Sequence, residues 1–161
     1  MTKLLLSVHV LAAILVLGPI AVAASLFPRY AREAASGGPA AASAALLHRI
    51  CRAYTVVGVA VPVFGIATGA QLGVLGDPWL VASLVLTALA AALLIATILP
   101  GQREMLEPLP DGAQAPSEHE EYARASRSQA ARLGMLTGVF NLLWAIVVVL
   151  MIVRPGSTTG A

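Results

Sequence analysis

Charged residues are scarce in this chain of 161 residues, at 11%, while hydrophobic residues make up 58%. A soluble domain has about 25% charged and about 45 to 50% apolar residues, so the composition excludes an ordinary water-soluble protein. Lysine occurs once, at Lys3, and there is no basic run, so we expect no nucleic-acid partner. Cys51 is the single cysteine, which excludes an internal disulfide and any multi-cysteine metal or iron–sulfur site.

Residues that could bind a metal are equally sparse. His48, Cys51 and His119 are scattered along the chain and do not have the spacing of a zinc site. We therefore predict no metal site and expect His48 to be solvated.

The sequence has instead four apolar runs, which cover residues 4–27, 54–76, 79–99 and 133–153. A hydrocarbon core about 30 Å thick needs about 20 residues of helix, so each run is long enough to cross a bilayer. We predict an all-α, polytopic membrane protein in which residues 1–161 form a single membrane domain in the lipid bilayer. Its architecture is expected to be a four-helix transmembrane bundle with a cytoplasmic extension of the fourth helix.

The segments that connect these runs are expected to be partly helical. Residues 40–54 are predicted to form a helix that leads into the second run, and Pro100 with Gly101 is expected to end or kink the third helix. From Ser117 onward, one unbroken helix is predicted to continue into the fourth run.

The distribution of arginine predicts the topology. Residues 28–53 and 100–132 hold eight arginines, whereas the termini and the turn after the second run hold only Lys3 and Arg154. Cytoplasmic loops carry the excess of basic residues, so both termini are expected outside the plasma membrane and the arginine-rich loops in the cytoplasm. Residues 4–27 also resemble a cleavable signal peptide. Cleavage would place the eight arginines outside, so we expect the first helix to be retained.

Glycines recur at helical spacing along the second run, at Gly58, Gly65, Gly69 and Gly73. Small residues let helix backbones approach closely in lipid, so we expect this face to pack against another helix. A glycine-lined permeation path is the functional alternative, although such paths generally also carry ionisable residues at depth. A homo-oligomer or a membrane-complex partner also stays open.

Strongly polar side chains are rare within the four runs. Counted from the outer helix ends, His9, Gln71 and Ser83 fall at one depth, while Asn141 and Trp144 lie near mid-membrane. An unpaired polar group in hydrocarbon costs several kcal/mol, so each of these needs a partner. We predict that His9, Gln71 and Ser83 form one hydrogen-bonded layer in the outer half of the membrane, and that any small ligand binds there.

Several short motifs are spread over nearly the whole chain. They are His9 early in the first run, LFPRY at residues 26–30, LHRICR at 47–52, GDPW at 76–79, and the apolar end at 148–155. In these motifs the chain resembles an uncharacterised family of predicted four-helix integral membrane proteins.

More remotely, the chain is similar to the copper-resistance D and four-helix membrane protoporphyrinogen oxidase group. In that group a first-helix histidine is associated with haem b, so the resemblance implies that His9 is the haem ligand. The oxidase also has a lysine soon after a tryptophan in its third helix. No lysine follows Trp79 in this chain, so the resemblance does not extend to oxidase activity.

Two classes of function follow from the sequence. The favoured class is a non-enzymatic accessory, scaffolding or small-solute membrane bundle, in which His9 is a structural hydrogen-bonding group. The alternative is a haem b- or quinone-linked redox protein that uses His9 as an axial ligand and Met151, near the same outer level, as a second ligand. No catalytic residue can be named in either class.

Cysteine labelling tests the predicted topology. On a Cys51-free background, a cysteine at position 158 should react with a membrane-impermeant reagent added from outside, because the termini are expected there. A cysteine at position 112, in the loop expected in the cytoplasm, should stay unlabelled. Labelling of position 112 without labelling of position 158 would show the reverse topology.

Overall fold

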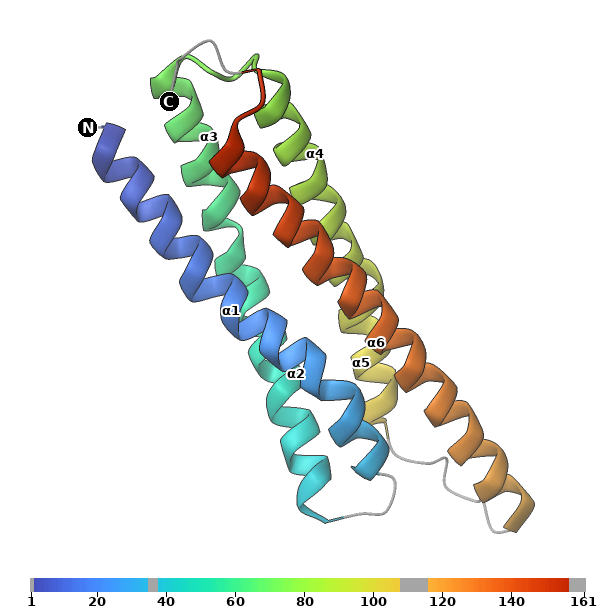
Figure 1. The fold of residues 1–161 in the computed structure, drawn as a ribbon. Helices are drawn as coiled ribbons and strands as arrows, with labels where there is room; N and C mark the ends of the chain where they lie inside the picture. The colour runs from blue at the N-terminus through green and yellow to red at the C-terminus, as the bar shows by residue number, and fades with distance from the viewer. Residues whose placement is uncertain (1, 35–37, 108–115, 157–161) are drawn as a thin grey trace.

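Helices make up nearly all of the computed structural model of the chain, which describes residues 2–34, 38–107 and 116–156 (Figure 1). The side chains of residues 2 and 116–119, His119 among them, lie outside the described ones. The elements are α1 (Thr2–Ala34), α2 (Pro39–Gly58), α3 (Ala60–Leu72), α4 (Pro78–Leu93), the π-helix η1 (Leu94–Ile98), α5 (Leu99–Leu106) and α6 (Pro116–Val153). No strand occurs within these ranges.

Four helical segments are long and apolar enough to cross a membrane: Lys3–Ala34, Pro39–Leu72, Pro78–Leu106 and Glu120–Val153. They alternate in direction, so the start of α1, the end of α6 and the turn between α3 and α4 lie together (Figure 1). We call this the terminal end of the bundle and the opposite one the arginine-rich end. The predicted all-α, four-helix architecture is confirmed. Helix α6 is continuous over 38 residues, or about 57 Å at 1.5 Å per residue, so the predicted extension of the fourth helix is confirmed as well.

Helix α1 continues through two prolines. Pro19 and Pro28 both lie inside it, and the helix extends to Ala34, well into the segment expected to connect the first two runs. Each proline removes one backbone donor, which weakens the helix locally. Around the second one, Phe27 and Ala31 are buried in a cluster with residues of α2 and α6. This packing holds the helix together beyond Pro28.

The second transmembrane segment is divided at Val59 into α2 and α3. Pro62 has no N–H, so the carbonyl of Gly58 lacks its helical donor, and a glycine at that position adds little stiffness. The N–H of Val63 reaches the carbonyl of Val59 only at 3.5 Å. The break therefore lies where the sequence removes a donor.

Of the two expectations for Pro100 and Gly101, that they end the third helix or that they kink it, the structure contradicts the first. Pro100 and Gly101 do not end the helix, which passes through the five-residue π-helix η1 and continues as α5 to Leu106. The π-helix directly precedes Pro100, where the missing N–H interrupts the regular hydrogen-bond ladder. A Cβ on Gly101 would lie 2.9 Å from Cδ2 of Leu133, so this glycine lets α5 approach α6 closely.

Helix α1 is central to the packing. It lies against α2, α3 and α6, whereas α4 packs chiefly against α6. The main core cluster contains Val16, Ile20, Ala23, Ala24, Cys51, Val61, Ala90, Leu94, Ile98 and Phe140. Its alanines allow the close helix contacts that stabilise bundles in lipid. Large apolar side chains such as Ile14, Val56 and Ile152 are exposed on the outside of the bundle, where a bilayer would surround them.

The glycines of the second segment have different surroundings. A Cβ on Gly58 would lie 3.4 Å from Cγ1 of Val16, and one on Gly69 would lie 2.8 Å from Cδ2 of Leu80. Gly73 has open space around it and a φ of 70°. The N–H of Val74 bonds to the carbonyl of Gly69 at 3.1 Å, so Gly73 is a left-handed cap that ends α3.

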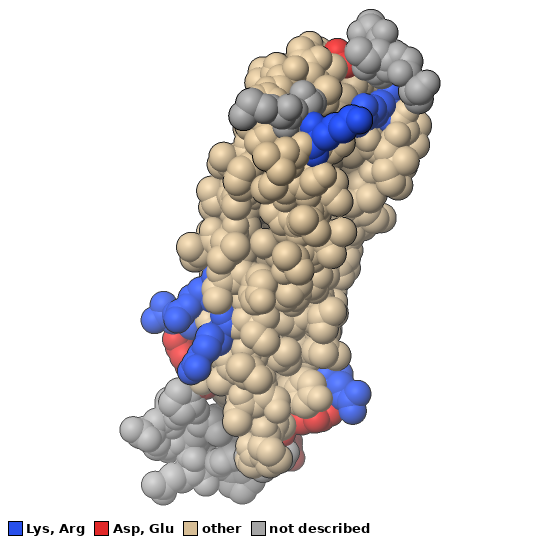
Figure 2. Space-filling model, turned by 90° about the vertical axis from the view of Figure 1, so that its left-hand side faces the viewer, with Lys and Arg blue, Asp and Glu red and all other residues tan. Residues whose placement is uncertain are grey.

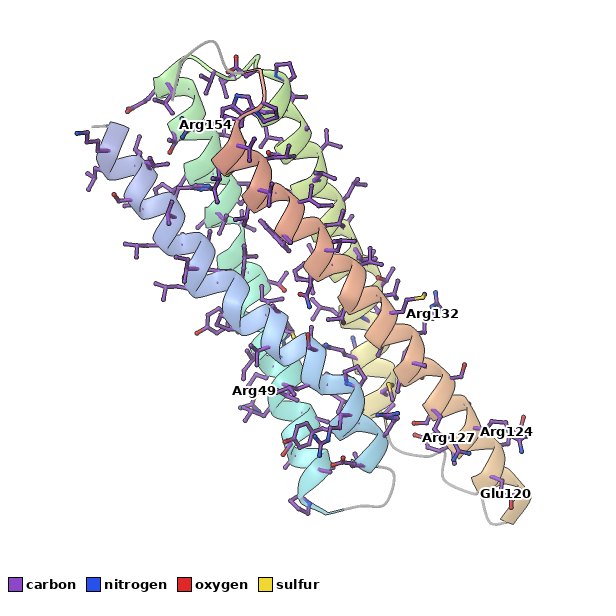
Figure 3. All side chains as sticks on the ribbon, viewed as in Figure 1. Arg49, Glu120, Arg124, Arg127, Arg132 and Arg154 are labelled. Carbon is purple, nitrogen blue, oxygen red and sulfur yellow. The ribbon has the colours of Figure 1, made fainter. Side chains whose placement is uncertain are left out.

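Charged side chains gather near the two ends, with a broad uncharged band between them on the face shown in Figure 2. Arg49 of α2 and Arg124, Arg127 and Arg132 of α6 lie toward the arginine-rich end, whereas Arg154 lies at the terminal end (Figure 3). This separation is what a bilayer requires, because charged groups are costly in its hydrocarbon core.

Replacing Gly69 by leucine should lower the thermal midpoint of unfolding in detergent, because the new side chain would collide with Leu80. Gly138→Leu is the matched control, since no atom lies within 4 Å of a Cβ built at Gly138. Equal midpoints for the two variants would contradict the close contact at Gly69.

Candidate functional site

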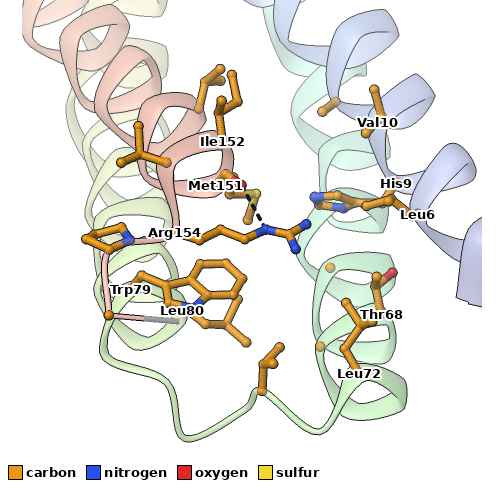
Figure 4. Close-up of a pocket in the computed structure, with 18 of the residues that line it drawn as sticks. Leu6, His9, Val10, Thr68, Leu72, Trp79, Leu80, Met151, Ile152 and Arg154 are labelled. Atoms are coloured by element: carbon orange, nitrogen blue, oxygen red, sulfur yellow. Dashed lines mark hydrogen bonds between the residues drawn. The ribbon is translucent and has the colours of Figure 1, made fainter. Parts of the chain in front are cut away.

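A cavity of about 820 Å³ lies at the terminal end, between α1, α3 and the end of α6 (Figure 4). Its lining is mostly apolar, with Leu6, Val10, Leu72, Leu80 and Ile152 among the residues that form it. Small-molecule sites are typically clefts of about 300 to 1,000 Å³ lined by apolar side chains with a few placed polar groups. The cavity has both properties.

His9 of α1 is a buried polar residue of this cavity, with 8% of its surface exposed, and Thr68 of α3 is another. Its Nδ1–H donates to the carbonyl of Val61 at 2.9 Å. A carbonyl can only accept, so Nδ1 carries the proton and Nε2 is the nitrogen available to other groups. A Cβ on Gly65 would lie 2.9 Å from Cε1 of His9. The glycine therefore makes room for the imidazole ring.

Arg154, which directly follows α6, reaches back into the same cavity. Figure 4 shows its guanidinium directed across the cavity toward His9. Its Nε donates to the carbonyl of Met151 at 3.3 Å, and its Cζ lies 5.6 Å from the ring centroid of Trp79. The indole N–H of Trp79 donates to Asp77 at 3.0 Å. The cation is thus held by a backbone carbonyl and an aromatic face.

A smaller cavity of about 60 Å³ lies deeper in the bundle and shares His9 and Met151 with the large one. Ser83 and Thr87 of α4 and Trp144 of α6 also line it. The indole nitrogen of Trp144 is buried and has no hydrogen-bond partner among the described residues. Buried donors are usually satisfied, so this space offers room for a water molecule or a polar ligand atom.

The structure brings some residues of the predicted polar layer together and separates others. His9 and Ser83 line the small cavity, and Ser83, which is fully buried, donates to the carbonyl of Trp79 at 2.8 Å. Gln71 is exposed and lines neither cavity. Asn141 donates to Ser25 at 3.2 Å, away from both cavities. Counting depth places residues at a level, but the rotation of the helix decides which side they face.

Three cavity residues were missed by the sequence analysis: Thr68, Trp79 as a lining group, and Arg154. Thr68 lies three residues before Gln71 and faces the cavity, although its hydroxyl donates to the carbonyl of Phe64 at 2.7 Å. A signal for Arg154 was present, because it and Lys3 are the only basic residues of the terminal end. The backward turn of its side chain has no sequence signature.

A polar network at the arginine-rich end corrects the expectation that His48 is solvated. His48 is half-buried, and its Nδ1 lies 3.1 Å from Oε1 of Gln102. The Nε2 of Gln102 donates to Sγ of Cys51 at 3.7 Å, and both of these residues are almost completely buried. The continuation of the helix past Pro100 places Gln102 there. Among the described residues, no group of three or more residues could hold a metal ion.

The profile of a protein family described as "Predicted integral membrane protein (DUF2269)" matches residues 3–155. The chain belongs to this family. No curated protein and no solved structure matches the chain. The predicted membership of an uncharacterised four-helix membrane family is therefore confirmed, whereas the resemblance to the copper-resistance D group is not shown.

As a member of the DUF2269 family with four apolar helices of spanning length, the protein is an integral membrane protein in contact with the lipid bilayer. The family description names no reaction and no ligand. Any statement of function has to come from the cavity itself.

Replacing Gln102 by alanine should destabilise the protein by about 1 to 3 kcal/mol, because the half-buried imidazole of His48 and the buried thiol of Cys51 each lose a hydrogen-bond partner. It should also make Cys51 more reactive toward a maleimide. Gln129→Ala is the matched control, because the bond of Gln129 to Glu104 is exposed to solvent. Equal stability and equal labelling of the two variants would show that the network is not structural.

Proposed function

We propose that the protein is a non-enzymatic membrane bundle that binds a small amphipathic molecule in the large cavity at the terminal end. The observation that carries this proposal is the composition of the cavity: a mostly apolar space of about 820 Å³ in which His9 of α1 and Arg154, the residue after α6, point toward each other. Such a site holds an apolar body and orients one polar end.

The rim of the cavity supports access from the lipid. Val10 and Ile14 on α1 and Val148 and Ile152 on α6 line the cavity and are also exposed on the outside of the bundle. In a membrane, this rim would face hydrocarbon chains. An amphipathic molecule could therefore enter sideways, without crossing water.

The lining also favours binding over catalysis. As the structure describes it, the cavity contains no carboxylate, thiol or lysine. His9 is oriented by a backbone carbonyl, and no hydroxyl nucleophile is bonded to it. A pair of nucleophile and base of the kind that activates hydrolases is therefore not assembled here.

A haem b- or quinone-linked redox role is the second candidate, and one observation favours it. A histidine that binds a metal commonly donates its other ring N–H to a carbonyl or carboxylate, which fixes the ring. His9 does so with Val61, and Met151 lines the same cavity. A histidine and a methionine are a known axial pair for haem iron. The side chains of His9 and Met151 are thus of the types that bind haem iron, and haem would supply electron-transfer chemistry.

The topology belongs to this proposal as well. We infer that both termini face outward from the plasma membrane and that the arginine-rich end faces the cytoplasm, from the eight arginines of residues 28–53 and 100–132. The cavity would then open in the outer leaflet. A homo-oligomer or a membrane-complex partner is compatible with this arrangement.

A cavity-filling variant tests the binding proposal. In neutral lipid nanodiscs, a monoacylglycerol should raise the thermal midpoint of the wild type in a saturable way, because a ligand that binds only the folded state stabilises it. Ala13→Phe places a ring in the cavity and should abolish this shift. Leu11→Phe, on the exposed face of the same helix, should behave like the wild type.

Equal shifts in all three proteins would contradict binding in the cavity. The same preparations decide the second candidate. A Soret band in the purified wild type that disappears in His9→Gln would establish haem ligation in place of the proposed role.

A further inference from the structure

We propose that the molecule bound in the large cavity is a single-chain amphiphile whose head is a carboxylate, such as a long-chain fatty acid, and that Arg154 binds this head. The inference rests on the proposed binding function and specifies its ligand. Its basis is the position of the Arg154 guanidinium inside a mostly apolar site.

The side chain of Arg154 departs from what its position predicts. An arginine that follows the last turn of a transmembrane helix ordinarily extends its charged head to water or lipid headgroups. Arg154 caps α6 in the left-handed conformation, with a φ of 45° and its N–H bonded to the carbonyl of Leu150 at 2.9 Å. Its side chain is instead turned back over Trp79. Its guanidinium is therefore directed into the cavity, toward His9 (Figure 4).

The charge of Arg154 has no carboxylate counterpart in the cavity lining. Asp77, on the turn before α4, does not line the cavity and accepts the indole N–H of Trp79. Arg29 and Glu33 of α1 form an ion pair near the arginine-rich end, away from this cavity. The half-buried cation of Arg154 thus has no anion among the residues that line the cavity, and an anionic head bound by its guanidinium would complete the site.

The donor geometry selects the kind of anion. A guanidinium has five N–H donors, and the structure assigns the Nε–H to the carbonyl of Met151. The remaining N–H groups can form the parallel pair of bonds that a carboxylate accepts with both oxygens. A head bound in this way leaves the apolar chain to the rest of the cavity.

The size of the cavity limits the remainder of the ligand. A volume of about 820 Å³ lies in the range of sites for one drug-sized molecule. One acyl chain fits such a space better than a complete two-chain phospholipid. The exposed apolar rim formed by Val10, Ile14 and Ile152 would let the chain extend into the surrounding lipid.

Fluorescence quenching of Trp79 tests this inference directly. The chain has two tryptophans, so Trp144→Phe leaves Trp79 as the only reporter, beside the proposed head site. The protein is placed in neutral phosphatidylcholine nanodiscs and titrated with a dibrominated fatty acid or with its methyl ester, at a pH at which the acid is ionised. Bromine quenches indole emission at near contact. We expect saturable quenching at a mole fraction of the acid several-fold lower than that of the ester.

Variants at Arg154 identify the source of that preference. In Arg154→Gln the acid and the ester should quench alike, whereas Arg154→Lys should retain part of the difference, because it keeps the charge without the paired N–H groups. Lys3→Gln is the matched control. It removes the same charge from the same end of the bundle, from an exposed residue outside the cavity, and should leave the preference unchanged.

The outcomes separate the two proposals. Equal saturable quenching by acid and ester in the wild type would overturn the carboxylate specificity and leave amphiphile binding intact. A preference that survives Arg154→Gln, or that Lys3→Gln removes as fully, would assign it to surface charge and also overturn the inference. Quenching that rises without saturation for both compounds would contradict the binding function itself.

Discussion

The need to satisfy backbone hydrogen bonds without water determines most of this structure. In hydrocarbon an unpaired N–H or carbonyl is costly, so a spanning segment must be helical, and any interruption must find partners inside the protein. The described interruptions lie close to prolines: the break at Val59 precedes Pro62, and the π-helix Leu94–Ile98 precedes Pro100. Elsewhere α1 continues through Pro19 and Pro28. Proline thus weakens these helices locally, and tertiary packing decides whether they break.

The two ends of the bundle use their polar residues differently. At the arginine-rich end, Gln102 bonds both His48 and Cys51, and Cys51 also donates to the carbonyl of Ile20. At the terminal end, Nδ1 of His9 donates to the carbonyl of Val61 and Nε2 is available to other groups. The Nε–H of Arg154 bonds to Met151, and its other N–H groups are available as well. A network that lines neither cavity stabilises the fold, whereas groups with remaining hydrogen-bonding capacity beside a cavity can bind a ligand. This contrast supports the proposed binding site at the terminal end.

The site depends on small residues as much as on polar ones. The imidazole of His9 occupies the space that a side chain at Gly65 would fill, and Leu80 reaches the backbone at Gly69. Two glycines of one helix face therefore serve two purposes, since one admits a polar ring and the other admits a packing side chain. Gly73, at the same spacing, ends the helix through its left-handed backbone conformation. Glycines at a regular spacing thus have different physical roles in this helix.

The sequence by itself determined the class of the protein, because the length and polarity of four runs must match the thickness of a bilayer whatever the details of packing. It also determined that α6 continues unbroken and that both ends of the described chain lie on one side of the bundle. Only the tertiary structure decided which polar residues meet. Depth follows from a residue count, so His9 and Ser83 could be placed level. Facing depends on helix rotation, on the break at Val59 and on the π-helix before Pro100. In the structure Gln71 faces outward, Gln102 meets His48, and Thr68 lines the cavity. The direction of the Arg154 side chain depends on one backbone torsion beyond the last helical turn. Contacts with Met151 and Trp79 hold the side chain there, and no pattern in the sequence predicts them.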